Sequence, residues 1–210
     1  MEPFWQPCYW QFMQSHALSI DAPLLDRMLT EIGEEFALRK EWVEIAIYGG
    51  AALLLHFSDR DSTRDIDYVA ISGNDSEIKS VATMVGARHG MEPEWFNDAV
   101  RISIHERREE PLHSIYPRFA TEGGMRVFAA SPRYILAMKL NIMRSSLESH
   151  DVEDIWNLLG HCEMKTFEEA EKLVKEFFPD IELSQRNKAI LQDVLDARAA
   201  GQEYDPMIGW

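Results

Sequence analysis

Residues 43–71 read VEIAIYGGAALLLHFSDRDSTRDIDYVAI, and this stretch decides the fold that we expect. Val43 to Tyr48 are mostly β-branched, aromatic or otherwise apolar, which is typical of a strand buried on both faces. Gly49 and Gly50 then predict a tight turn into a short apolar helix. Because the first amide groups of a helix have no partner inside it, they point back toward the turn and are suited to binding phosphate.

Two aspartates open the next predicted strand. Asp65 and Asp67 are separated by one residue, so both side chains leave the same face of a strand, with Cα atoms roughly 6.5 Å apart. Carboxylate oxygens in such a pair are ligands suited to Mg²⁺ or Mn²⁺. A glycine pair or an Asp-x-Asp motif alone is more often structural, whereas the turn, the helix and the paired carboxylates together are more specific.

The same stretch resembles the signature of the nucleotidyltransferase superfamily, whose members share the DNA polymerase β palm. It is most similar to the AbiEii-like toxins and to uncharacterised bacterial nucleotidyltransferases, in which a Gly-Gly or Gly-Ser turn precedes an R-x-x-T-x-D-x-D run. The resemblance implies a metal-binding pair and a set of nucleotide-binding residues. The pair is Asp65 and Asp67, and the nucleotide-binding set is Gly49, Gly50, Arg60 and Thr63.

Lys139 extends the resemblance and is unusual in its own right. Its neighbours three and four positions away on a predicted helix are all apolar, so its ammonium group must either reach the edge of that face or meet an anion. The run Leu136–Leu140 reads LAMKL and resembles the L-x-x-K-L motif of the AbiEii-like families. The resemblance implies that Lys139 contacts the nucleotide phosphates and belongs to the catalytic set.

A further motif lies at residues 150–155, which read HDVEDI. The run resembles the K/R-D-x-x-D motif of those families, with His150 in place of the usual basic residue. The resemblance implies that an aspartate acts as a base or positions the acceptor, and we favour Asp151 over Asp154 for this role. An acidic residue near a helix start also simply complements the helix dipole.

The chain departs from the fullest polymerase β pattern, which has a third metal-binding carboxylate on a later strand. The alternation of apolar and polar residues over 100–105 predicts that strand, but no acidic residue lies in it. The nearest candidate is Asp98, in a Trp-Phe-Asn-Asp run that resembles a W-x-N-D segment of the uncharacterised families. A turn or cap role for Asp98 is an equal alternative.

Strands and helices alternate along the first half of the chain, which favours an α/β (α+β) fold over a helical bundle. We expect a mixed sheet of the nucleotidyltransferase type, flanked by helices. Residues 1–130 form the core, with an aromatic N-terminal arm and a helix, and residues 131–210 form a helical segment that completes the active-site cleft. The arm, residues 1–19, packs on the core or contacts another subunit.

Charge and composition limit the function further. A net charge of −15 opposes broad binding to nucleic acid, although basic residues outnumber acidic ones between Ala99 and Ser146. Arginines in the predicted 106–124 loop are suited to gripping a triphosphate or an acceptor, or simply lie in a solvated loop. Cys8 and Cys162 are too few for a disulfide framework or a zinc site. No apolar run is long enough for a membrane span, so we expect a cytoplasmic protein, and the family resemblance implies a bacterial source.

These observations predict an enzyme, a Mg²⁺- or Mn²⁺-dependent nucleotidyltransferase. It would transfer a nucleoside monophosphate from an NTP to an acceptor that the sequence does not name, whether tRNA, a protein or a small molecule. The resemblance to the AbiEii-like toxins implies that the enzyme is the toxin of a toxin–antitoxin pair with a cognate antitoxin as partner. The aromatic arm leaves a second copy of the chain open as the partner instead. The alternative is a non-catalytic or partner-regulated binding module of such a pair, which the missing third carboxylate and the aromatic arm favour.

Overall fold

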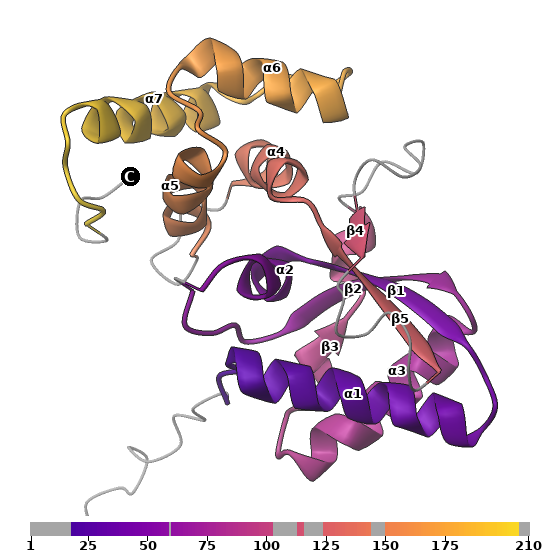
Figure 1. The fold of residues 1–210 in the computed structure, drawn as a ribbon. Coiled ribbons are helices and arrows are strands. Elements are labelled where there is room, and N and C mark those ends of the chain that lie inside the picture. The colour runs from indigo at the N-terminus through magenta and orange to yellow at the C-terminus, as the bar shows by residue number, and fades with distance from the viewer. Residues whose placement is uncertain (1–17, 59, 103–112, 116–123, 144–149, 206–210) are drawn as a thin grey trace, which may run out of the picture.

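The computed structural model describes residues 18–58, 60–102, 113–115, 124–143 and 150–205, which fold around a five-stranded mixed sheet (Figure 1). Its strands have the order β3-β2-β1-β5-β4. They are β1 (Val43–Tyr48), β2 (Ile66–Ser72), β3 (Phe96–Asn97), β4 (His113–Ile115) and β5 (Met125–Ala130). Because β1 is antiparallel to β2 but parallel to β5, the predicted mixed sheet is confirmed.

Helices cover the sheet unequally. α1 (Ala22–Leu38) and α3 (Asp75–Arg88) contact each other and pack against the sheet, whereas α2 (Gly49–His56) follows β1 directly and contacts β1 and β2 (Figure 1). The side chains of Ile66 and Tyr68, on one face of β2, are fully buried. On the opposite face, Asp67 is half-buried and Ile71 is 47% exposed. One face of the sheet is therefore partly open, and Asp67 lies on it.

The C-terminal part is helical, as the sequence predicts. α4 (Pro132–Ile142), α5 (Asp151–His161), α6 (Phe167–Phe177) and α7 (Gln185–Ala199) gather beyond one side of the sheet, at the top of Figure 1. The buried apolar side chains of the sheet and of these helices form one continuous cluster. α7 is also tied to α4 by Asn187, whose buried amide donates hydrogen bonds to the carbonyl groups of Leu140 (2.9 Å) and Asn141 (3.0 Å).

Helix starts follow local sequence signals. The side chains of Asp21 and Ser131 accept hydrogen bonds from the backbone three residues on, and Asn74 accepts from Ser76 and Glu77 at the start of α3. Thr166 and Glu169 form a reciprocal capping box at the start of α6. Each cap satisfies amide groups that no helical partner reaches, so local sequence defines where these helices begin.

The predicted strand over residues 100–105 is wrong where the structure describes it. Ala99–Ile102 forms a 3₁₀ turn, and the strand that pairs with β2 is the two-residue β3 just before it. The reason is aromatic packing, because Phe96 is buried and its ring stacks on Tyr68 at a centroid distance of 4.1 Å. Residues 103–105, most of the predicted 106–124 loop and residues 1–17 of the aromatic arm lie outside the described residues.

No helix within the described ranges combines the length and the apolar character needed to cross a membrane.

Candidate functional site

The turn between β1 and α2, which we call the glycine turn, consists of Gly49 and Gly50. Gly49 has φ +59°, in the left-handed region that favours glycine, and a Cβ atom built on it would lie 2.7 Å from Oδ2 of Asp67. A Cβ atom on Gly50 would lie 2.7 Å both from Nη2 of Arg60 and from Oγ1 of Thr63. A carboxylate, a guanidinium and a hydroxyl group therefore all lie against this backbone, and glycine is needed at both positions.

Strand pairing brings Asp67 to the glycine turn. In the antiparallel register of β1 and β2, Asp67 is the partner of Tyr48, the residue that precedes Gly49. The segment before β2 is held by a backbone bridge, in which Thr63 and Ile20 exchange hydrogen bonds of 2.7 and 2.9 Å. The Thr63 hydroxyl also donates to the carbonyl oxygen of Asp65, at 3.1 Å. Local pairing thus fixes the predicted metal-binding segment beside the turn.

Asp65 has a neighbour that the sequence did not single out. β3 runs parallel to β2 with Asn97 in register with Asp67, and the Asn97 amide donates a long hydrogen bond, 3.4 Å, to Oδ2 of Asp65. An amide therefore lies beside the aspartate pair. Among the described residues, no group of three or more His, Cys, Asp or Glu side chains is placed to hold a metal ion.

Asp98, the sequence candidate for a third carboxylate, lies near Tyr68 and the start of the 3₁₀ turn. Its carbonyl oxygen accepts the Arg101 amide at 3.0 Å. Burial raises the pKa of the Tyr68 hydroxyl, which donates to Asp75, and the negative charges of Asp75 and Asp98 raise that pKa further. The turn alternative for Asp98 matches this backbone contact.

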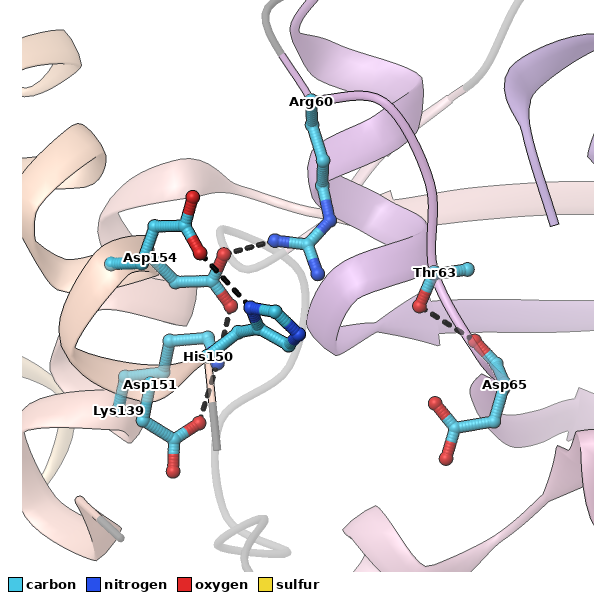
Figure 2. A network of polar contacts seen from close by, with 8 residues as sticks. Arg60, Thr63, Asp65, Lys139, His150, Asp151 and Asp154 are labelled. Carbon is cyan, nitrogen blue, oxygen red and sulfur yellow. Dashed lines mark hydrogen bonds and ion pairs between the residues drawn. The ribbon is translucent and has the colours of Figure 1, made fainter. Parts of the chain in front are cut away.

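Four charged side chains form a second group, the ion-pair network: Arg60, Lys139, Asp151 and Asp154 (Figure 2). The Lys139 ammonium group lies 2.8 Å from Oδ1 of Asp151 and 2.8 Å from Oδ2 of Asp154. The other oxygen of Asp154 pairs with the Arg60 guanidinium. Asp154, with a side chain only 4% exposed, thus bridges the two cations.

The helices explain why these charges meet. Asp151 and Asp154 are one turn apart in α5, so they share a helix face, and Lys139 reaches both from α4. The sequence predicts that Lys139 either reaches the edge of its apolar helix face or meets an anion. In the structure it meets two anions, the carboxylates of Asp151 and Asp154. The two positive and two negative charges balance, which is the condition under which charged groups tolerate burial.

Arg60 joins the glycine turn to the ion-pair network. Its guanidinium lies against Gly50, where the Cβ atom of any other residue would be. It also pairs with Asp154 of α5, 94 residues further along the chain. Figure 2 shows Arg60 reaching down from the loop after α2 toward Asp154, with Thr63 and Asp65 on the other side of the helix end. All eight residues predicted for the site therefore lie in two adjoining groups.

Two residues of this arrangement were outside the predicted site. Asp154 was passed over in favour of Asp151, although its spacing of three residues already placed both on one helix face. Asn97 carried no sequence signal beyond its place in the Trp-Phe-Asn-Asp run, because its position beside Asp65 depends on the pairing of β3 with β2.

No protein-family model, curated protein or solved structure matches this chain.

Proposed function

We propose that this chain is a divalent-metal-dependent nucleotidyltransferase that transfers a nucleoside monophosphate from an NTP to an acceptor hydroxyl. The main support for this proposal is that the Asp67 carboxylate and the Arg60 guanidinium both lie against the backbone of the glycine turn. Backbone amide groups at a helix start and a guanidinium bind phosphate, and a carboxylate binds the cation that accompanies it. The AbiEii-like resemblance of the same residues agrees with this reading.

The residues at this position fit Mg²⁺ or Mn²⁺. Both ions prefer oxygen ligands, and Mg²⁺ is commonly held by one or two carboxylates together with substrate phosphates and water. Asp65 and Asp67 supply such a pair, and the residue beside Asp65 is Asn97, an amide rather than a third carboxylate. The remaining ligands of the ion would come from the substrate. When bound, the ion neutralises the triphosphate and favours the departure of pyrophosphate.

The chain's own residues divide the remaining tasks. Amide groups that follow Gly49 and Gly50 bind the β and γ phosphates, and Arg60 and Lys139 supply positive charge. Both cations hold carboxylates of α5 in the structure, so the phosphates would exchange with or add to these partners. The resulting stabilisation is greatest for charge that develops on the leaving pyrophosphate.

Asp151 is the residue that we assign to the acceptor. Its carboxylate is held by Lys139 at 2.8 Å, which fixes its orientation. It accepts a hydrogen bond from the acceptor hydroxyl and takes up the proton as the hydroxyl oxygen attacks the α-phosphorus. The new P–O bond forms as the bond to pyrophosphate breaks. The acceptor class, whether tRNA, protein or small molecule, stays open.

Incubation with labelled NTPs tests the proposal. The purified protein is combined with Mg²⁺, each α-³²P-labelled NTP in turn and a cell extract, and transfer of label to tRNA, protein or small molecules is separated by electrophoresis and mass spectrometry. Label should appear in one of these classes and should be absent with the Asp65→Asn/Asp67→Asn variant. Equal labelling by the variant would disprove the assignment of these aspartates.

A binding module of a toxin–antitoxin pair is the second candidate. Two observations favour it, namely the amide of Asn97 rather than a carboxylate beside Asp65, and the carboxylate partners already held by Arg60 and Lys139. Such a module would bind NTP and metal without releasing pyrophosphate in the presence of extract. An adjacent reading frame that encodes a small helical or winged-helix protein would favour the pair in either form.

A further inference from the structure

A cavity of about 450 Å³ lies between α2, the loop that follows it and α5. Arg60, Thr63 and Asp154 line it, so it adjoins both the glycine turn and the ion-pair network. Phe57 and His161 line it as well. Phe57 follows Gly50 by seven residues, which along a helix axis is about 10 Å. The cavity therefore runs from Arg60 and Thr63, which lie against Gly50, to the C-terminal end of α2.

The part of the cavity near Phe57 is aromatic and apolar. The rings of Phe57 and His161 stack with their centroids 3.8 Å apart and their planes inclined by 12°. Leu53 and Leu158, both buried, contribute aliphatic surface. Asn157, which is exposed and lies one turn before His161 on α5, adds an amide that can both donate and accept hydrogen bonds.

The charged groups of the cavity are largely paired with one another. Arg60 pairs with Asp154, and the His150 ring nitrogen lies 2.9 Å from the Glu153 carboxylate. A second polyanionic group would therefore have to compete with these carboxylates for Arg60 and His150. A flat, uncharged heteroaromatic group with hydrogen-bonding edges matches the lining better, because it can pack on an aromatic pair and use a side-chain amide.

From these observations, and resting on the proposed function, we propose that this cavity is the base subsite of the NTP. The triphosphate lies at the glycine turn, the ribose passes Arg60 and Thr63, and the base packs against the Phe57–His161 pair. Asn157 hydrogen-bonds the edge of the base and contributes to the choice among NTPs. The acceptor is the competing occupant, and the experiment below distinguishes the two.

The test compares ligands with and without a base. Isothermal titration calorimetry in Mg²⁺ measures the affinities of ATP, GTP, CTP, UTP and inorganic tripolyphosphate for the parent protein and for His161→Ala and Asn157→Ala. Gln202→Ala is the matched control, because it removes an amide from an exposed position outside the cavity. Urea unfolding of each variant confirms that the fold is retained.

We expect at least one NTP to bind the parent more tightly than tripolyphosphate by about fivefold or more, the scale of one stacked base. His161→Ala should remove most of that difference, and Asn157→Ala should reduce the preference among the four NTPs, while tripolyphosphate affinity stays unchanged in both. Gln202→Ala should match the parent throughout.

Two other outcomes overturn the inference in separable ways. If NTPs and tripolyphosphate bind the parent equally, or if both cavity variants keep the NTP advantage, the base lies elsewhere, the cavity is left to the acceptor and the proposed function stands. If neither NTPs nor tripolyphosphate bind the parent in Mg²⁺, the proposed function itself fails and the base subsite fails with it.

Discussion

The guanidinium of Arg60 occupies the space of the side chain that Gly50 lacks, with Nη2 2.7 Å from the position of a Cβ atom there. The same guanidinium pairs with Asp154 of α5. A single side chain thus ties the predicted phosphate-binding turn to the C-terminal helices. Changes at the turn and changes in the ion-pair network should consequently affect each other.

Metal and nucleotide together should stabilise the protein through Asp65 and Asp67. A ligand that binds only the folded state raises stability by about 2.7 kcal/mol at one hundred times its Kd. Differential scanning fluorimetry with Mg²⁺ and NTP should show a higher Tm for the parent and no shift for Asp65→Asn/Asp67→Asn. Asp193→Asn is the control and should respond like the parent, since Asp193 is an exposed residue of α7 outside the predicted site. An unchanged shift in the double variant would place the metal elsewhere.

Lys139→Met should destabilise the protein. The neighbours of Lys139 on its helix are apolar, which taken alone would favour methionine at this position. The structure predicts a cost of about 3–5 kcal/mol, because the change leaves the buried carboxylates of Asp151 and Asp154 without their shared cation. Urea unfolding measures this cost.

Adding Asp151→Asn to Lys139→Met should recover part of the loss, because it removes a buried charge that has lost its Lys139 partner, whereas Asp154 keeps its pair with Arg60. A single Lys139→Met variant as stable as the parent would show that the two pairs contribute no net stability.

Gly49→Ala should lower both the stability of the fold and the affinity for NTP. Gly49 and Gly201 both have positive φ, +59° and +70°, so alanine strains the backbone at each, by about 1 kcal/mol or more. A Cβ atom on Gly49 also meets Asp67, whereas one on Gly201 meets nothing within 4 Å. Gly201→Ala is thus a matched control.

The two glycine variants are compared by urea unfolding and by NTP titration in Mg²⁺. Gly49→Ala should be the less stable and should lose affinity for NTP, while Gly201→Ala should keep the parent affinity. Equal losses of stability would mean that Asp67 moves aside without cost.

His56 should make stability depend on pH below neutrality. Burial lowers the pKa of His56, and its ring nitrogen lies 2.9 Å from the carbonyl oxygen of Ala130, a contact that opposes this shift. The unfolded chain therefore binds the proton at a higher pH than the folded chain. Stability is complete above the unfolded pKa, about 6.5, and falls as pH decreases from there through the folded pKa.

His56→Gln keeps a donor for Ala130 but does not titrate. The free energy of unfolding, measured from pH 7.5 to 5, should fall more steeply for the parent than for this variant. Parallel curves would show that His56 titrates alike in the folded and unfolded states.

Local sequence determined much of this molecule. The strand–turn–helix of residues 43–56 and the helix starts at Asp21, Asn74, Ser131 and Thr166 depend on residues within a few positions of one another, which is why composition and caps predict them. The alternating pattern of residues 100–105 gave a wrong prediction of a strand. Alternation indicates which side chains would share one face of a strand, but it does not say which segment pairs with β2.

Only the tertiary structure decided the partners of the site. The sequence required an anion for Lys139 but did not say that Asp154 would share it with Arg60, and it gave Asn97 no role beside Asp65. Arg60 and Asp154 are 94 residues apart, and Asp65 meets Asn97 only through the parallel pairing of β2 and β3. Contacts of this kind depend on how whole elements pack around a shared core, which no local pattern of residues encodes.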